Sequence, residues 1–227
     1  MSANISKIIL VHGAWADGTS WAKVIPLLAK SGLEATAVQL PLTSFEADVA
    51  AVRRAIALTE GELVLVGHSY AGAVIGEAGN DPKVARLVYI DAFAPDAGES
   101  AGTLFEKFDV APLGGEIRPD SEGFLKLTQK GVFDLFAQDL DNTEKAVIFA
   151  TQGPIHGSAL GGTLTRAAWR TRPTYYLIGD QDFAIPPAEQ AGMASRMKAT
   201  VAHVDASHVP MLSKPETVAR FIAEASA

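Results

Sequence analysis

A serine that could act as a nucleophile stands at position 69, within the stretch Gly67-His68-Ser69-Tyr70-Ala71-Gly72. The apolar run before it, residues 62–66, predicts a strand, and residues 70–78 predict a helix. A sharp strand-to-helix turn lifts a serine hydroxyl above the sheet edge, and small residues must flank it because the backbone is crowded. The pattern departs from G-x-S-x-G because alanine stands at position 71, one place before the second glycine. A βα turn with a helix-capping serine would look the same, so the motif needs support from elsewhere.

The elements that must position this serine alternate along the chain. Apolar runs predict strands, and residues with helical spacing follow most of them. Such alternation predicts a parallel sheet of about six strands with helices on both faces. The predicted strands span residues 7–11, 34–40, 62–66, 84–90, 174–178 and 200–204, and the predicted helices span residues 21–31, 45–58, 70–78, 187–197 and 215–226.

Polar residues at the carboxyl ends of these strands are the candidates for a site, because open parallel sheets bind ligands there. A serine hydroxyl needs an adjacent base, and His208 follows the last predicted strand. Asp180 and Asp182 follow the fifth strand, while Asp91 and Asp205 are weaker candidates for the acid. The order serine, aspartate, histidine is the one expected for a Ser-His-acid triad on this architecture.

Composition narrows the functional classes. The 227 residues are 48% hydrophobic, which is enough for one core and predicts a single domain over residues 1–227. The net charge of −7 and the absence of a basic cluster make nucleic acid and anionic membranes unexpected partners. The apolar run 8–11 is too short for a signal peptide or membrane span, so a cytoplasmic protein is expected. The sequence has no cysteine, no phosphate-binding glycine motif and no metal-ligand spacing, so neither a cofactor nor a metal is expected.

Residues 94–170 break the alternation. This segment is rich in glycine, proline and short stretches with helical spacing. It is interpreted as a small helical cap inserted between the fourth and fifth strands, folded over the carboxyl edge of the sheet. Helices are expected within it over residues 121–129, 132–138 and 143–151.

Four stretches together resemble the α/β-hydrolase fold family, and in particular its small cap-bearing esterases, which include plant methylesterases and hydroxynitrile lyases. The likeness covers nearly the whole chain except the middle segment. The stretches that carry it are Val11-His12-Gly13-Ala14-Trp15, Gly67-His68-Ser69-Tyr70-Ala71-Gly72, Gly179-Asp180-Gln181-Asp182 and Ser207-His208.

The resemblance implies a role for each matching residue. Ser69 would be the nucleophile, His208 the base and Asp182 the acid, with an oxyanion hole made by the backbone N–H groups of Ala14 and Tyr70. His12 and His68 would be structural residues in hydrogen-bonded turns. Aromatic and apolar residues near the strand ends are candidates for the pocket: Trp15, Phe93, Phe183 and Met211.

The implied activity is a carboxylesterase-type serine hydrolase that cleaves small esters or lactones through an acyl-enzyme. Two alternatives remain: a hydroxynitrile lyase that uses the same triad, and a small-molecule receptor with little turnover. The lyases of this family commonly have a lysine after the histidine, whereas this chain has Val209. The residue at 209 therefore favours hydrolysis of an ester over cleavage of a cyanohydrin.

Overall fold

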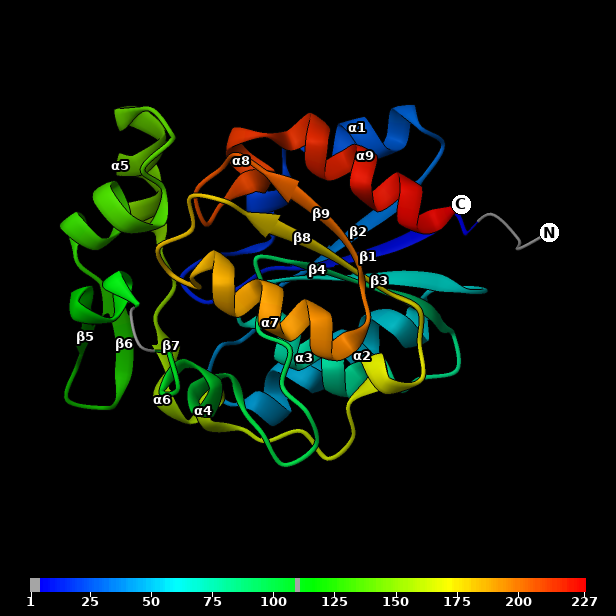
Figure 1. Cartoon of the computed structure of the whole chain (residues 1–227), viewed down its shortest axis with the longest axis horizontal. Coiled ribbons are helices and arrows are strands. Elements are labelled where there is room, and N and C mark those ends of the chain that lie inside the picture. The colour runs from blue at the N-terminus through cyan, green and yellow to red at the C-terminus, as the bar shows by residue number, and fades with distance from the viewer. Residues whose placement is uncertain (1–4, 109–110) are drawn as a thin grey trace.

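The computed structural model describes residues 5–108 and 111–227, and its centre is a six-stranded parallel sheet (Figure 1). In spatial order the strands are β2 (Glu34–Val38), β1 (Lys7–Val11), β3 (Leu63–His68), β4 (Val84–Ile90), β8 (Thr174–Gly179) and β9 (Thr200–Val204). All six predicted strands are confirmed, with ends within two residues of the expected ones. The central strand β3 is buried along its whole length, because helices cover both faces of the sheet.

Helices lie on the two faces of this sheet, as Figure 1 shows. One face carries α1 (Ile25–Lys30), α8 (Pro210–Ser213) and α9 (Pro215–Ser226), and the other carries α2 (Phe45–Leu58), α3 (Ala71–Ala78) and α7 (Pro187–Met197). The predicted ends of α2, α7 and α9 are confirmed. None of the helices in the described ranges combines the length and the apolar character that a membrane span requires.

The predicted helix over residues 21–31 is interrupted. A 3-10 turn, η1 (Gly18–Trp21), comes first, and α1 begins only at Ile25. Pro26 lies in the first turn of α1, where its missing N–H costs nothing and its fixed φ favours the start of a helix. The proline therefore opens a helix here rather than disturbing one.

The middle segment contains a second sheet that the sequence did not predict. Its antiparallel strands are β5 (Ile117–Pro119), β6 (Phe124–Leu127) and β7 (Ile155–His156). The other elements are α4 (Ala101–Phe105), η2 (Pro112–Glu116), η3 (Gly131–Phe136), α5 (Asn142–Thr151), α6 (Gly157–Gly161) and η4 (Ala168–Arg170). Figure 1 places α5 and β5–β7 beside the sheet, at the end away from the C-terminus.

The expected helix over residues 121–129 is wrong. The chain there forms a hairpin, because Asp120 Oδ1 accepts the N–H groups of Glu122 and Phe124 at 2.8 and 2.9 Å. Gly123 adopts a φ of +86°, which glycine tolerates in a turn. These local hydrogen bonds outweigh the helical spacing of the apolar residues.

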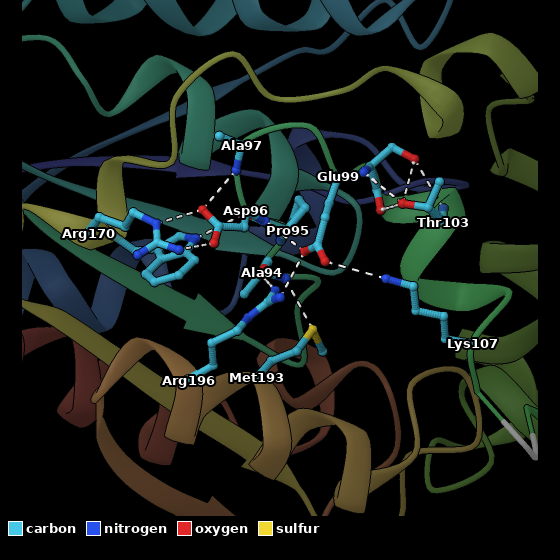
Figure 2. Close-up of polar contacts among 12 residues, drawn as sticks. Ala94, Pro95, Asp96, Ala97, Glu99, Thr103, Lys107, Arg170, Met193 and Arg196 are labelled. Atoms are coloured by element: carbon cyan, nitrogen blue, oxygen red, sulfur yellow. Dashed lines mark hydrogen bonds and ion pairs between the residues drawn. The ribbon is translucent and has the colours of Figure 1, made fainter.

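A polar network fixes the point where this segment leaves and rejoins the sheet (Figure 2). Asp96, after β4, accepts hydrogen bonds from the guanidinium of Arg170, near the end of the segment, with Nε at 2.7 Å from Oδ1. Arg196 of α7 donates to Glu99 Oε2 at 2.9 Å and to the Ala94 carbonyl at 2.6 Å. The two ends of the segment are thus joined to each other and to α7.

Candidate active site

Ser69 sits on a strained turn between β3 and α3. Its φ is +55°, a left-handed value that a residue other than glycine adopts only when its surroundings enforce it. The Ser69 N–H donates to the Ile90 carbonyl at 3.2 Å, and the Ser69 carbonyl accepts from the Phe93 N–H at 3.1 Å. A Cβ at Gly72 would lie 2.0 Å from the Phe93 carbonyl oxygen. A side chain has no room at position 72, whereas the methyl group of Ala71 is buried within the turn.

The structure brings Ser69, His208 and Asp182 into one chain of hydrogen bonds. The distance from Ser69 Oγ to His208 Nε2 is 2.8 Å, and that from His208 Nδ1 to Asp182 Oδ2 is 2.7 Å. All three residues are buried, with Ser69 the most exposed at 5%. Nδ1 must carry a proton to donate to the carboxylate, so Nε2 is free to accept the serine proton.

Asp182 is held by donors on both of its oxygens. Oδ1 accepts the N–H groups of Ala184 at 2.7 Å and Ile185 at 3.0 Å, and Oδ2 accepts Gln190 Nε2 at 2.8 Å besides the histidine. Four donors surround a negative charge that has no access to water. Gln190 was not predicted, and its only signal in the sequence is its place on one face of α7.

Of the other candidate acids, Asp180 and Asp205 lie at the surface and Asp91 lies buried beside the histidine. Asp180 Oδ1 is 2.8 Å from His203 Nδ1 in a partly exposed pair, so this carboxylate faces away from the serine. Asp205 is exposed. Asp91 is fully buried, and polar atoms of Asp91, Asp182 and His208 lie within 4.8 Å of one another. The conformation of the loop after β8 therefore brings Asp182 to the histidine and leaves Asp180 at the surface. Asp91 is a second buried carboxyl group near the histidine.

Ala14 and Tyr70, the residues expected to form an oxyanion hole, lie beside Ser69. Both residues line the same small cavity as Ser69, and neither N–H donates a hydrogen bond within the described ranges. The two turns approach closely, because a Cβ at Gly13 would lie 2.7 Å from Ser69 Cβ. Two free donors next to a serine hydroxyl can stabilise the charge that develops on a carbonyl oxygen.

The Tyr70 side chain anchors the turn at Ser69 to the helix α2. Its hydroxyl donates to Asp48 Oδ2 at 2.8 Å, and Asp48 Oδ1 accepts the Leu42 N–H at 2.8 Å. Burial, followed by the charge of Asp48, raises the pKa of Tyr70, and burial also raises the pKa of Asp48. The sequence did not single out Asp48, although an acid beside Val49 in the apolar stripe of α2 was a usable signal.

His12 and His68 make backbone hydrogen bonds. His12 Nε2 accepts the Leu40 N–H at 3.0 Å, so Nδ1 carries the proton and donates to the Gly13 carbonyl at 2.8 Å. His68 Nε2 donates to the His208 carbonyl at 2.7 Å. Burial lowers the pKa of both imidazoles, which keeps them neutral. His68 thereby fixes the backbone that carries His208.

Two cavities meet at Trp15. The smaller, of about 80 Å³, contains Ser69 and His208, and the larger, of about 260 Å³, lies between η1, α5 and α8. The inserted segment contributes six residues to the smaller cavity, which are Ala101, Gly102, Phe105, Leu113, Ile117 and Leu160. Within the described ranges, no lysine or arginine lines either cavity.

The four predicted pocket residues occupy different places. Trp15 lines both cavities, Phe93 lines the smaller and Met211 the larger. Phe183 lines neither of these two cavities and is 38% exposed, so its place in a substrate pocket stays a prediction. The tight turn around Asp182 directs the neighbouring Ala184 inward and leaves Phe183 at the surface.

The inserted segment also contacts the loops that carry His208 and Asp182. Asp139 Oδ2 accepts the Ser207 N–H at 3.0 Å, and Gln138 Nε2 donates to the Gln181 carbonyl at 2.6 Å. The Phe136 ring lies 5.0 Å from the His208 ring, centre to centre. The segment therefore packs directly against the loops that carry the histidine and the acid.

Comparison with known proteins agrees with this geometry. Residues 8–221 match the model of the alpha/beta hydrolase family. The chain is 26% identical to methylesterase 7 of Arabidopsis thaliana, covering 97% of this chain and 96% of that protein. It is 28% identical to a pyrethroid hydrolase of Sphingobium wenxiniae, covering 97% and 87%. Polyneuridine aldehyde esterase has a similar fold, with a TM-score of 0.85 at 20% identity over 98% of this chain and 100% of that one. The chain therefore belongs to the alpha/beta hydrolase family, and it is an esterase-type hydrolase of that family.

Proposed function

We propose that Ser69, His208 and Asp182 are the catalytic triad of an esterase that cleaves small carboxylic esters or lactones through an acyl-enzyme. The observation that carries this proposal is the continuous relay from Ser69 Oγ through His208 to Asp182, with hydrogen bonds of 2.8 and 2.7 Å. A serine hydroxyl becomes a useful nucleophile only when a base is held at this distance.

The reaction follows from the positions of these atoms. Ser69 Oγ attacks the ester carbonyl while its proton passes to His208 Nε2, and Asp182 stabilises the imidazolium that forms. The N–H groups of Ala14 and Tyr70 hold the oxyanion. The imidazolium then gives its proton to the leaving alkoxide, which departs as the alcohol and leaves the acyl-enzyme. Water, deprotonated by the same imidazole, releases the acid and restores the serine.

The residues that line the cavities favour a substrate whose acyl group is neutral and apolar. Among the described residues that line the smaller cavity, Ser69 and His208 have polar side chains open to it, since the Tyr70 hydroxyl is bound to Asp48 and the Trp15 N–H to the Leu125 carbonyl. Six of this cavity's fourteen lining residues come from residues 94–170, which we propose as a cap within a single domain over residues 1–227. A cytoplasmic location stays a prediction.

Among the described residues, neither cavity is lined by a lysine or an arginine, and this weighs against the lyase alternative. A departing cyanide carries negative charge, which in a water-poor site needs a counter-charge. Lys214 is exposed, and no lysine or arginine in the described chain lines the cavity that holds Ser69. An ester needs no such group, because its developing charge falls on the oxygen that Ala14 and Tyr70 face.

The proposal is tested with activated aryl esters of graded acyl length, a set of lactones and mandelonitrile. We expect steady turnover of the esters, and release of cyanide from mandelonitrile at no more than the uncatalysed rate. A reactive phosphonate ester that traps nucleophilic serines should form a single adduct, which mass spectrometry should locate on Ser69. Cyanide release equal to ester turnover would establish the lyase instead. One burst of product without further turnover would indicate a receptor that merely reacts with the ester.

A further inference from the structure

A second carboxyl group lies buried beside the triad. Asp91 directly follows β4, with a φ of +43°, and its side chain is fully buried. The Gly179 N–H donates to Asp91 Oδ1 at 2.5 Å, whereas Oδ2 has no partner within the described ranges. Polar atoms of Asp91, Asp182 and His208 lie within 4.8 Å of one another. A charge on Asp91 would therefore act strongly on the imidazole.

The two carboxyls differ in what surrounds them. Two buried carboxyls this close do not both ionise, so one of them keeps a proton. Asp182 receives four hydrogen bonds, and Asp91 receives one. Burial first, and the charge of Asp182 second, raise the pKa of Asp91 well above its ordinary value. The negative charge therefore resides on Asp182 while Asp91 is neutral.

The other ionisable groups around Asp91 act in the same direction. Asp139 and Asp180 are negative and further disfavour a charge on Asp91. Tyr176 is a neutral phenol whose own pKa is raised by burial and then by Asp91, and its hydroxyl donates to the Ala92 carbonyl. No lysine or arginine is among the charges that act on Asp91 in the described chain. The titratable groups that interact with Asp91 through their charge or lie next to it are Asp139, Tyr176, Asp180, Asp182 and His208.

We infer that Asp91 is a reserve acid, a positioning residue that stays protonated while Asp182 is charged and ionises to support His208 when that charge is removed. The inference rests on the proposed roles of Ser69 and His208 in hydrolysis. Loss of the Asp182 charge removes the nearest repulsion, so Asp91 releases its proton to bulk water at a lower pH. The resulting carboxylate stabilises the imidazolium from within 4.8 Å.

The test is a cycle of four full-length proteins: native, Asp91→Asn, Asp182→Asn and the double variant. Ester turnover is measured from pH 5 to pH 10. In Asp182→Asn we expect turnover to rise with pH beyond the point where His208 has lost its proton, because ionised Asp91 becomes available. The Asp91→Asn change should cost at least about tenfold more in the Asp182→Asn background than alone. A merely structural role predicts equal costs in both backgrounds.

Two measurements without substrate keep the inference separate from the proposed function. In the native protein, the ¹³C carboxyl signal of Asp91 should be that of a protonated acid at pH 7, which needs no variant to fold. The pKa of His208, followed by NMR, should fall further in the double variant than in Asp182→Asn. An ionised Asp91 in the native protein, or the same His208 pKa in both variants, would overturn the reserve acid. If these titrations behave as expected but no ester is turned over, the hydrolase proposal fails and the charge coupling stands.

Asp180→Asn in the Asp182→Asn background is the matched control. This carboxylate lies on the same loop but pairs with His203 at the surface. Its removal should keep the alkaline rise of turnover and move it only slightly to lower pH, because the charge of Asp180 is the weakest of the causes that raise the pKa of Asp91. If the rise were lost in this control, the charge of the loop after β8 would account for it, and the role inferred for Asp91 would be overturned.

Discussion

The sheet edge and the inserted segment form opposite sides of the same small cavity, and they are held by different forces. On the sheet side, Ser69, His208 and Asp182 are joined through hydrogen bonds with defined donors and acceptors. On the segment side, side chains such as Phe105 and Leu160 line the cavity by packing alone. Hydrogen bonds fix atoms to within tenths of an ångström, whereas apolar packing tolerates substitution when volume is kept.

This difference separates the chemistry from the choice of substrate. In the proposed function the sheet side supplies the atoms that react, and its backbone strain at Ser69 is sustained by the loop after β4. The segment side sets how much room an acyl group finds. Changes on the sheet side should therefore lower turnover of every ester, and changes on the segment side should alter which ester is preferred.

The largest effect is expected for Ser69→Ala. Loss of the nucleophile should reduce turnover by roughly 10⁶-fold, because the triad acts as a unit. Steady-state rates with an activated ester measure this loss, and circular dichroism checks the fold. Ser226→Ala is the control, since the side chain of this buried serine on α9 bonds the Ile222 carbonyl and no other described residue. A tenth of the native rate remaining in pure Ser69→Ala would move the nucleophile to another residue.

The next effect separates the two aspartates of one loop. Asp182→Asn should reduce turnover at pH 7 by up to roughly 10⁴-fold, because the imidazole loses its orientation and its counter-charge. Asp180→Asn should cost less than about threefold, since it removes a surface pair with His203. Rates of both variants at one pH decide the matter. A reversed order of the two losses would contradict the assignment of the acid.

The segment side is tested by opening the cavity wall. Leu160→Ala should shift the preference towards longer acyl groups by roughly 10- to 200-fold in kcat/KM, which is the range for filling or emptying an apolar pocket. Leu125→Ala is the matched control, because this leucine of the same segment is also partly buried but lines neither cavity. An equal fall for all esters in Leu160→Ala would show that the segment also positions the reacting atoms.

The strands of the large sheet could be predicted from the sequence because each is marked by its own residues, without reference to its partners. Strands such as β3 are apolar along their length, since both faces are covered, and period and composition alone reveal them. The turn at Ser69 was found for the same reason, as its crowded backbone requires small residues. The second sheet was missed because β6 pairs with β7, whose residues lie about thirty positions away, and short strands carry little periodic signal.

Within the site, the limit of the sequence was the conformation of loops. Asp180 and Asp182 are two residues apart, and nothing in their types shows which one turns inward. The N–H groups of Ala184 and Ile185, directed at Asp182 Oδ1, decide it. Gln190 was missed because a glutamine on a helix has no pattern that marks it as a partner of the acid.

The smallest effect is expected where the segment is attached, at the partly exposed pair of Asp96 and Arg170. Hydrogen bonds from Arg170 lower the pKa of Asp96, so the pair stabilises the fold above the ordinary pKa of an aspartate. That stability is lost as the pH falls through the lowered pKa. Asp96→Asn should lower Tm at pH 7 by at most about 4 °C, because water and salt screen the pair.

Thermal unfolding at pH 7 and at pH 3, with and without 0.5 M NaCl, measures this effect. The difference from native protein should shrink in salt, and it should shrink at the lower pH because Asp96 is losing its charge there. Glu60→Gln, at an exposed carboxylate with no ion pair in the described chain, gives the baseline. Ester turnover should stay within about threefold of native, since the pair lies outside both cavities. A larger fall in turnover would mean that the attachment of the segment governs the chemistry, and the division between the two sides of the cavity would no longer hold.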